Sequence, residues 1–139
     1  DLTKPIFHNV FAMWMYFPQI KAERTCIQMD ISEDMITVEH DYNLPEMRRM
    51  FLDSKVDHVL IPVLGTIKQR GQLRDDWREF LKCALFCCPF LTLNLTDSAR
   101  FSPPITLLGL SMAIEMGSES RNKRSLIDQT LDRVSDALN

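Results

Sequence analysis

Glycine is scarce in this chain, with four residues among 139. Loops that cradle phosphate groups, such as the P-loop and the dinucleotide-binding fingerprint, need several closely spaced glycines so that the backbone can approach the ligand. Neither pattern is present, and the Gly-x-Ser-x-Gly turn that carries the nucleophile of many hydrolases is absent too. The sequence therefore excludes the enzyme classes that these motifs define.

Long apolar runs are also missing. The longest apolar stretch covers about 13 residues, from Pro5 to Phe17, whereas a membrane-spanning helix needs roughly 20. The formal net charge is −3, which does not suit a protein whose whole surface binds a polyanion. We therefore expect no membrane span, and any contact with nucleic acid has to be local.

The four cysteines do not follow the pattern of a secreted disulfide scaffold. Three of them, Cys83, Cys87 and Cys88, lie close together, and Cys26 is remote. Because secreted scaffolds disperse their cysteines, this clustering favours an intracellular, reducing compartment, either the cytoplasm or the nucleus. No Cys-x-x-Cys pair and no closely spaced histidine pair is present, so we expect no metal site and no cofactor.

The same cysteines are poor candidates for a catalytic nucleophile. They occur beside Leu85, Phe86 and Phe90, and apolar surroundings raise the pKa of a thiol and leave it unreactive. We therefore expect no catalytic residues. An enzyme built on Cys83 or Cys87 together with His58 is the remaining alternative.

Hydrophobic periodicity and capping residues predict a helix-dominated α+β fold. A period of two from Cys26 to His40 predicts a β-hairpin, whose many carboxylates indicate a solvated acidic surface. The β-branched run 56–64 predicts a buried strand. Because proline cannot donate a backbone hydrogen bond, Pro62 restricts it to an edge strand or an interrupted element. Other elements are a short strand at 91–95 and helices at 5–17, 45–53, 72–88 and 105–116 and after Ser125.

The length suits one globular domain, residues 1–139, with about five helices and a small, mostly antiparallel sheet. The chain begins at Asp1 and not at a methionine, and no signal peptide is recognisable. We therefore expect a piece excised from a longer protein.

The predicted N-terminal helix is apolar almost all round, and Pro18 ends it. One interpretation is a central helix buried by the rest of the domain. The other is an interface, because three phenylalanines, one tryptophan and one tyrosine are more than one small core normally covers on every face of a helix.

These patterns favour a non-enzymatic protein–protein interaction or oligomerisation domain of a larger intracellular protein, cellular or viral. The partner is a second protein or a second copy in a homodimer, bound through an apolar aromatic helix surface. The residues expected to bind the partner are Phe7, Phe11, Trp14, Leu131 and Val134.

The alternative is an RNA- or DNA-binding module of a ribonucleoprotein or replication complex. Its phosphate contacts would be Lys68, Arg70, Arg74 and Arg78, with Arg74 and Arg78 one turn apart on a predicted helix flank. Neighbouring carboxylates offer these arginines ion pairs on an ordinary solvated surface, which argues against this alternative.

Overall fold

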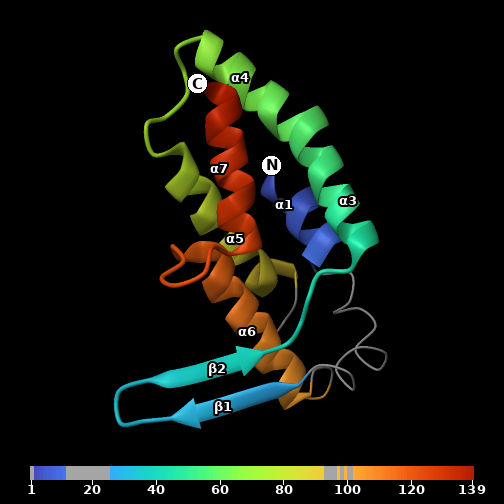
Figure 1. The fold of residues 1–139 in the computed structure, drawn as a ribbon, viewed down its shortest axis with the longest axis vertical. Helices are drawn as coiled ribbons and strands as arrows, with labels where there is room; N and C mark the ends of the chain where they lie inside the picture. Colours follow the sequence, from blue (N-terminus) through green and yellow to red (C-terminus); the bar gives the residue numbers. More distant parts are fainter. Residues whose placement is uncertain (1, 12–25, 93–96, 98, 100–101) are drawn as a thin grey trace.

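The computed structural model describes residues 2–11, 26–92, 97, 99 and 102–139 (Figure 1). Helices make up most of the described chain, and a two-stranded antiparallel sheet projects from them. The predicted helix-dominated α+β class is therefore confirmed. None of the described helices is long and apolar enough to cross a membrane.

The predicted hairpin is confirmed as β1 (Ile27–Ile31) and β2 (Ile36–His40). The strands are antiparallel, and Ile31 pairs with Ile36 directly before and after the turn 32–35. The alternation of apolar and polar residues predicts both strands because successive side chains of a strand point to opposite faces.

A continuous helical run follows the hairpin. In it α3 (Glu46–Lys55) leads through one π-helical turn, η4 (Val56–Leu60), into α4 (Ile61–Gln69). The strand predicted over 56–64 is therefore wrong. Pro62 fits because it lies in the first turn of α4, where a missing amide hydrogen costs little, and because a π-helical turn precedes it.

This run turns one stripe of side chains into the core. Leu52, Val56, Leu60 and Leu64 are all buried, and their spacing of four residues keeps them on one helical face. Val59, on another face, is 47% exposed. A strand buried on both faces would have covered Val59 as well.

The N-terminal segment forms α1 (Thr3–Ile6) and one π-helical turn, η1 (Phe7–Phe11). Val10 is buried in the core, so this part agrees with the interpretation of a central helix. Residues 12–17 of the predicted helix, with Trp14, lie outside the described residues.

The helix predicted over 72–88 is α5 (Trp77–Thr92), which begins later and continues through Pro89. The chain before Trp77 forms a turn, in which the Arg74 guanidinium binds both carboxylate oxygens of Asp76 at 2.7 and 2.9 Å. The predicted strand 91–95 therefore starts inside a helix, and its residues 93–95 lie outside the described part of the chain.

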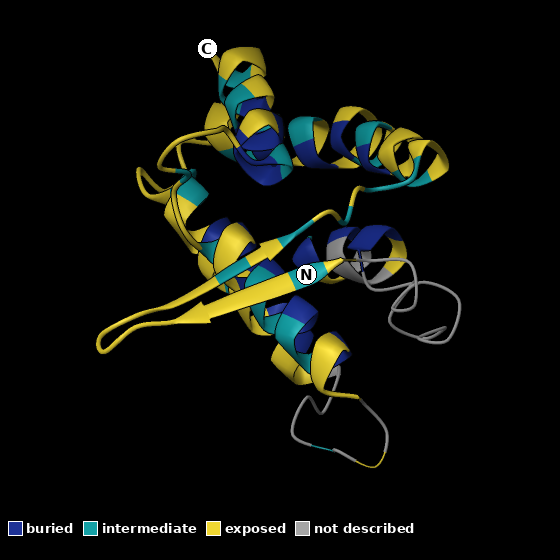
Figure 2. Ribbon diagram, turned by 60° about the horizontal axis from the view of Figure 1, so that its bottom comes forward, coloured by how far each residue is buried: buried dark blue, intermediate teal, exposed yellow. Residues whose placement is uncertain are grey.

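The other three predicted helices are confirmed. The prediction at 45–53 corresponds to α3, the one at 105–116 to α6 (Pro103–Gly117), and the terminal one to α7 (Leu126–Leu138). α5 packs extensively on α6, while α7 packs on α4 and η4. Figure 2 shows buried residues where the helices face one another and a hairpin that is exposed along most of its length.

Two glycines are expected to respond to alanine with opposite signs. At Gly117 an alanine Cβ would lie 2.7 Å from the Cβ of Phe86, so Gly117→Ala should lower the free energy of unfolding by about 1–3 kcal/mol. At Gly65 the nearest atom is 3.9 Å away, and Gly65→Ala should raise it by about 0.4–1 kcal/mol by restricting the unfolded backbone. Urea unfolding measures both changes. Equal effects would contradict the close packing of α5 on α6.

Candidate functional site

The hairpin separates apolar from polar side chains. The strand register places one apolar set on the same face of the sheet: Ile27, Met29, Ile31, Ile36 and Val38. The opposite face carries the polar set: Gln28, Asp30, Thr37 and Glu39. The hairpin is therefore amphipathic, although only two strands form the sheet in the described part of the chain.

The apolar face of the hairpin is covered only near its base. Ile27 is half-buried and packs against the core, whereas Ile31 and Ile36, next to the turn, are 63% and 62% exposed. Figure 2 shows the hairpin extending beyond the helices, with its outer part exposed. An isolated two-stranded hairpin is at best marginally stable in water, so this uncovered face favours burial against another surface.

A second apolar surface lies between α1 and α5. It is a cavity of about 660 Å³, here called the α1–α5 groove, and it is lined by Leu2, Thr3, Lys4, Phe80, Leu81, Ala84, Cys87, Cys88 and Leu91. Phe80 and Leu91 are exposed at this surface. The guanidinium of Arg74 lies 5.2 Å from the centre of the Phe80 ring. The groove therefore combines a mainly apolar lining with cationic groups.

Lys82 and Asp128 form a buried ion pair between α5 and α7, with side chains 4% and 0% exposed. Asp128 also accepts hydrogen bonds from the hydroxyl and the amide of Ser120, the latter at 2.9 Å. Burial alone would raise the pKa of the Asp128 carboxyl. The hydrogen bonds from Lys82 and Ser120 outweigh burial and hold this pKa well below its usual range.

More charged side chains surround this buried pair. Arg78 contacts Asp132 at 2.8 Å, and Arg124 contacts the same carboxylate at 2.7 Å and Glu119 at 3.1 Å. Glu119 also accepts a hydrogen bond from Lys82 at 3.0 Å. The network joins α5, the loop before α7 and α7 itself, so its role is to hold these elements together.

The basic residues predicted to contact nucleic acid are held in different environments. Arg78 belongs to the ion-pair network, Arg74 is paired with Asp76, and Lys68 donates to a carbonyl in the last turn of α7. Arg70 lies in the exposed turn after α4. The predicted helix flank is wrong because Arg74 precedes α5 and Arg78 faces α7.

The predicted partner-binding residues lie mostly in the core. Phe11, Leu131 and Val134 are buried, because α7 and η1 turn their apolar stripes toward the other helices. These three side chains already have their apolar contacts within the chain. The side chain of Phe7 and the whole of Trp14 lie outside what the structure describes. Exposed apolar side chains occur instead on the hairpin and along the α1–α5 groove, and also on α3 at Met47 and Met50.

The clustered cysteines differ in exposure. Cys88 is buried, its thiol donates to the Thr3 hydroxyl at 3.8 Å, and burial raises its pKa. Cys83 and Cys87 are exposed on α5, which their apolar sequence neighbours do not indicate. No group of three or more side chains that could hold a metal ion occurs in the described part of the chain.

Comparison of the chain with protein-family models, with curated proteins and with solved structures finds no match. Its function therefore has to be argued from its own surfaces.

The hairpin surface had a signal in the sequence. The alternation places Met29 and Ile31 on one face of the first strand and Ile36 and Val38 on one face of the second, and apart from these only the segments 56–64 and 91–95 were predicted as strands. An apolar strand face needs a second layer to cover it. The sequence predicts few further strands that could cover the apolar face of the hairpin, and it does not show which helix would cover it. These two points together could have marked the face as a candidate interface.

Proposed function

We propose that this chain is a non-enzymatic association domain in which the apolar face of the hairpin binds a second copy of the chain. The observation that carries the proposal is the exposure of Ile31 and Ile36 at the outer end of the amphipathic hairpin. Each Å² of apolar area removed from water favours association by about 25 cal/mol, against which the loss of translational, rotational and side-chain freedom is set. Such a function makes and breaks no covalent bond.

The α1–α5 groove supports a second copy as the occupant. Its lining is mainly apolar and includes the cationic Lys4, whereas the Arg74 that stands beside Phe80 is already paired with Asp76. The hairpin segment 26–41 carries neither lysine nor arginine, and two of its five carboxylates, Glu33 and Asp34, lie in the turn next to Ile31 and Ile36. Opposite charges around matching apolar surfaces favour specific and rapid association. Because one chain carries both surfaces, copies can associate head to tail, which yields a ring or an open chain of subunits.

Substitution on the two faces of the hairpin tests the proposal. Ile36→Lys places a charge on the apolar face and should weaken self-association at least about tenfold, as measured by analytical ultracentrifugation. Thr37→Lys, the matched control, makes the same kind of change one residue away on the polar face and should leave association within about twofold. Equal effects of the two variants would show that this face does not carry association.

Mixing two variants tests the head-to-tail arrangement. Leu91→Lys places a charge at the α1–α5 groove, on a side chain that is 84% exposed, so folding should be preserved. Alone, Ile36→Lys and Leu91→Lys should each stay monomeric. Mixed, they should form a complex of one copy of each, because an intact hairpin on one meets an intact groove on the other. Normal self-association of Leu91→Lys alone would exclude the groove as the surface that binds the hairpin. Pairing of one hairpin with another would then be the remaining arrangement.

A further inference from the structure

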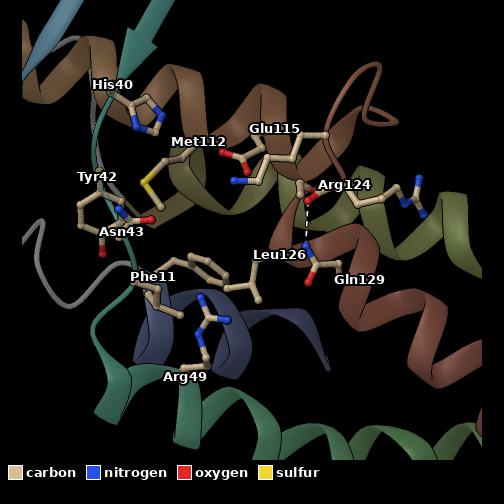
Figure 3. Close-up of a pocket in the computed structure, with 13 residues that line it drawn as sticks. Phe11, His40, Tyr42, Asn43, Arg49, Met112, Glu115, Arg124, Leu126 and Gln129 are labelled. Atoms are coloured by element: carbon tan, nitrogen blue, oxygen red, sulfur yellow. Dashed lines mark hydrogen bonds between the residues drawn. The ribbon is translucent and has the colours of Figure 1, made fainter.

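A cavity of about 250 Å³ lies on another part of the molecule, between the chain that follows β2, α3, α6 and the start of α7 (Figure 3). The segment 40–44 forms one wall. Arg49 enters from α3, Met112 and Glu115 come from α6, and Arg124 lies just before α7. Elements far apart in the sequence therefore build this cavity together.

Cationic side chains outnumber carboxylates along the wall of the cavity. Arg49, Lys123 and Arg124 line it, and Glu115 is the one carboxylate among its described lining residues. Arg124 is already paired with Asp132. Arg49 and Lys123 have no ion-pair partner among the residues that the structure describes, so both are available to a ligand anion.

His40 also lines this cavity. Its Nδ1 has no hydrogen-bond partner in the described part of the chain, but this atom is shielded from solvent, so it is not among the contacts of the ligand. Phe11 and Leu126 supply apolar wall. Burial raises the pKa of Tyr42 well above its usual value, against the opposing effect of Arg48, so Tyr42 adds no negative charge.

We infer that this cavity binds a phosphate group that carries one ring, either in a free mononucleotide or in single-stranded RNA. The phosphate lies beside Lys123, and Arg49 adds a second positive charge to the wall; neither side chain has an ion-pair partner within the described part of the chain. The base or sugar packs against the apolar wall at the half-buried Leu126, next to the edge of the largely buried Phe11. The volume lies below the roughly 300–1,000 Å³ of sites for larger ligands, which suits a single nucleotide unit. None of the residues that carry the proposed self-association takes part.

Calorimetric titration of the wild-type chain tests the inference with three probes. Adenosine monophosphate and a short single-stranded oligouridine RNA are expected to bind, and adenosine is expected to bind at least about tenfold more weakly because it lacks the phosphate. Whichever phosphate-bearing probe binds more tightly identifies the source of the phosphate. Equal affinity for adenosine and its monophosphate, or binding of neither phosphate-bearing probe, would overturn the inference.

Three exposed residues near the cavity give matched variants. Lys123→Gln should weaken binding of adenosine monophosphate roughly fivefold or more, whereas Arg121→Gln, a control that removes the same charge outside the cavity, should change it by less than about twofold. Glu115→Gln should strengthen binding because it removes the carboxylate that repels phosphate. Equal losses in Lys123→Gln and Arg121→Gln would mean that general surface charge, and not this cavity, attracts the probe.

Discussion

Replacement of Asp128 by asparagine is expected to lower the free energy of unfolding by about 3 kcal/mol or more. The Asp128 carboxylate is fully buried and pairs with Lys82, whose side chain is 4% exposed. Asparagine keeps the shape but removes the charge, so within the described part of the chain Lys82 retains only the more exposed Glu119 as a charged partner. A buried charge that has lost its partner is strongly destabilising. Urea unfolding at neutral pH measures the change.

Asp53→Asn is the matched control for this substitution. Asp53 pairs with Arg133 at 3.0 Å, but both side chains are nearly half exposed, so loss of this pair should cost no more than about 1 kcal/mol. Comparable losses in the two variants would contradict the structural role given to the buried pair.

Asp128 also makes stability depend on pH. Its pKa in the folded chain lies below the ordinary value of 3.8, so the folded state holds its proton less tightly than the unfolded state. The carboxylate therefore contributes stability above the unfolded pKa, and this contribution is lost as the pH falls toward the folded pKa. The difference in stability between wild type and Asp128→Asn should be complete at neutral pH and shrink below about pH 4.

Leu60→Ala is expected to lower the free energy of unfolding by about 2–5 kcal/mol. Leu60 is buried in the π-helical turn between α3 and α4, within the stripe that faces the core, and its truncation leaves a cavity. Val59→Ala is the control, because Val59 is exposed on the neighbouring face and its truncation should cost less than about 1 kcal/mol. A large loss at both positions would favour a strand buried on both faces. Thermal unfolding of the two variants distinguishes these outcomes.

Elements with a regular period and a local capping residue could be predicted from the sequence. The hairpin alternates over 26–40, and α7 repeats Ile127 and Val134 after its capping residue, Ser125. The Ser125 hydroxyl accepts a hydrogen bond from the backbone amide of Asp128 at 3.1 Å, as the sequence indicates. Both signals lie within the element that they specify.

The segment 56–64 could not be predicted in this way. Val56, Leu60 and Leu64 share one face in a strand and also in a helix, because their spacing of four residues fits both periods. Pro62 is equally compatible with an edge strand and with the first turn of a helix. The helical form is decided by packing of η4 and α4 against α7, which lies far along the chain.

The candidate site was only partly predictable for a similar reason. The alternation fixes the faces within each strand, but it does not show that Ile31 and Ile36 share one face across the turn or that nothing in the described chain covers them. Lys82 and Asp128 lie 46 residues apart, and charged residues on helices are usually solvated, so their burial has no local signal. Both features depend on how distant elements pack.

Light scattering coupled to size exclusion, across a concentration series at low and high salt, tests association most directly. Self-association through the hairpin predicts a mass that rises with concentration above the 16.2 kDa of one chain. The rise should persist at high salt, because burial of apolar area is not screened by salt. A mass of 16.2 kDa at every concentration and both salts would contradict self-association through the hairpin.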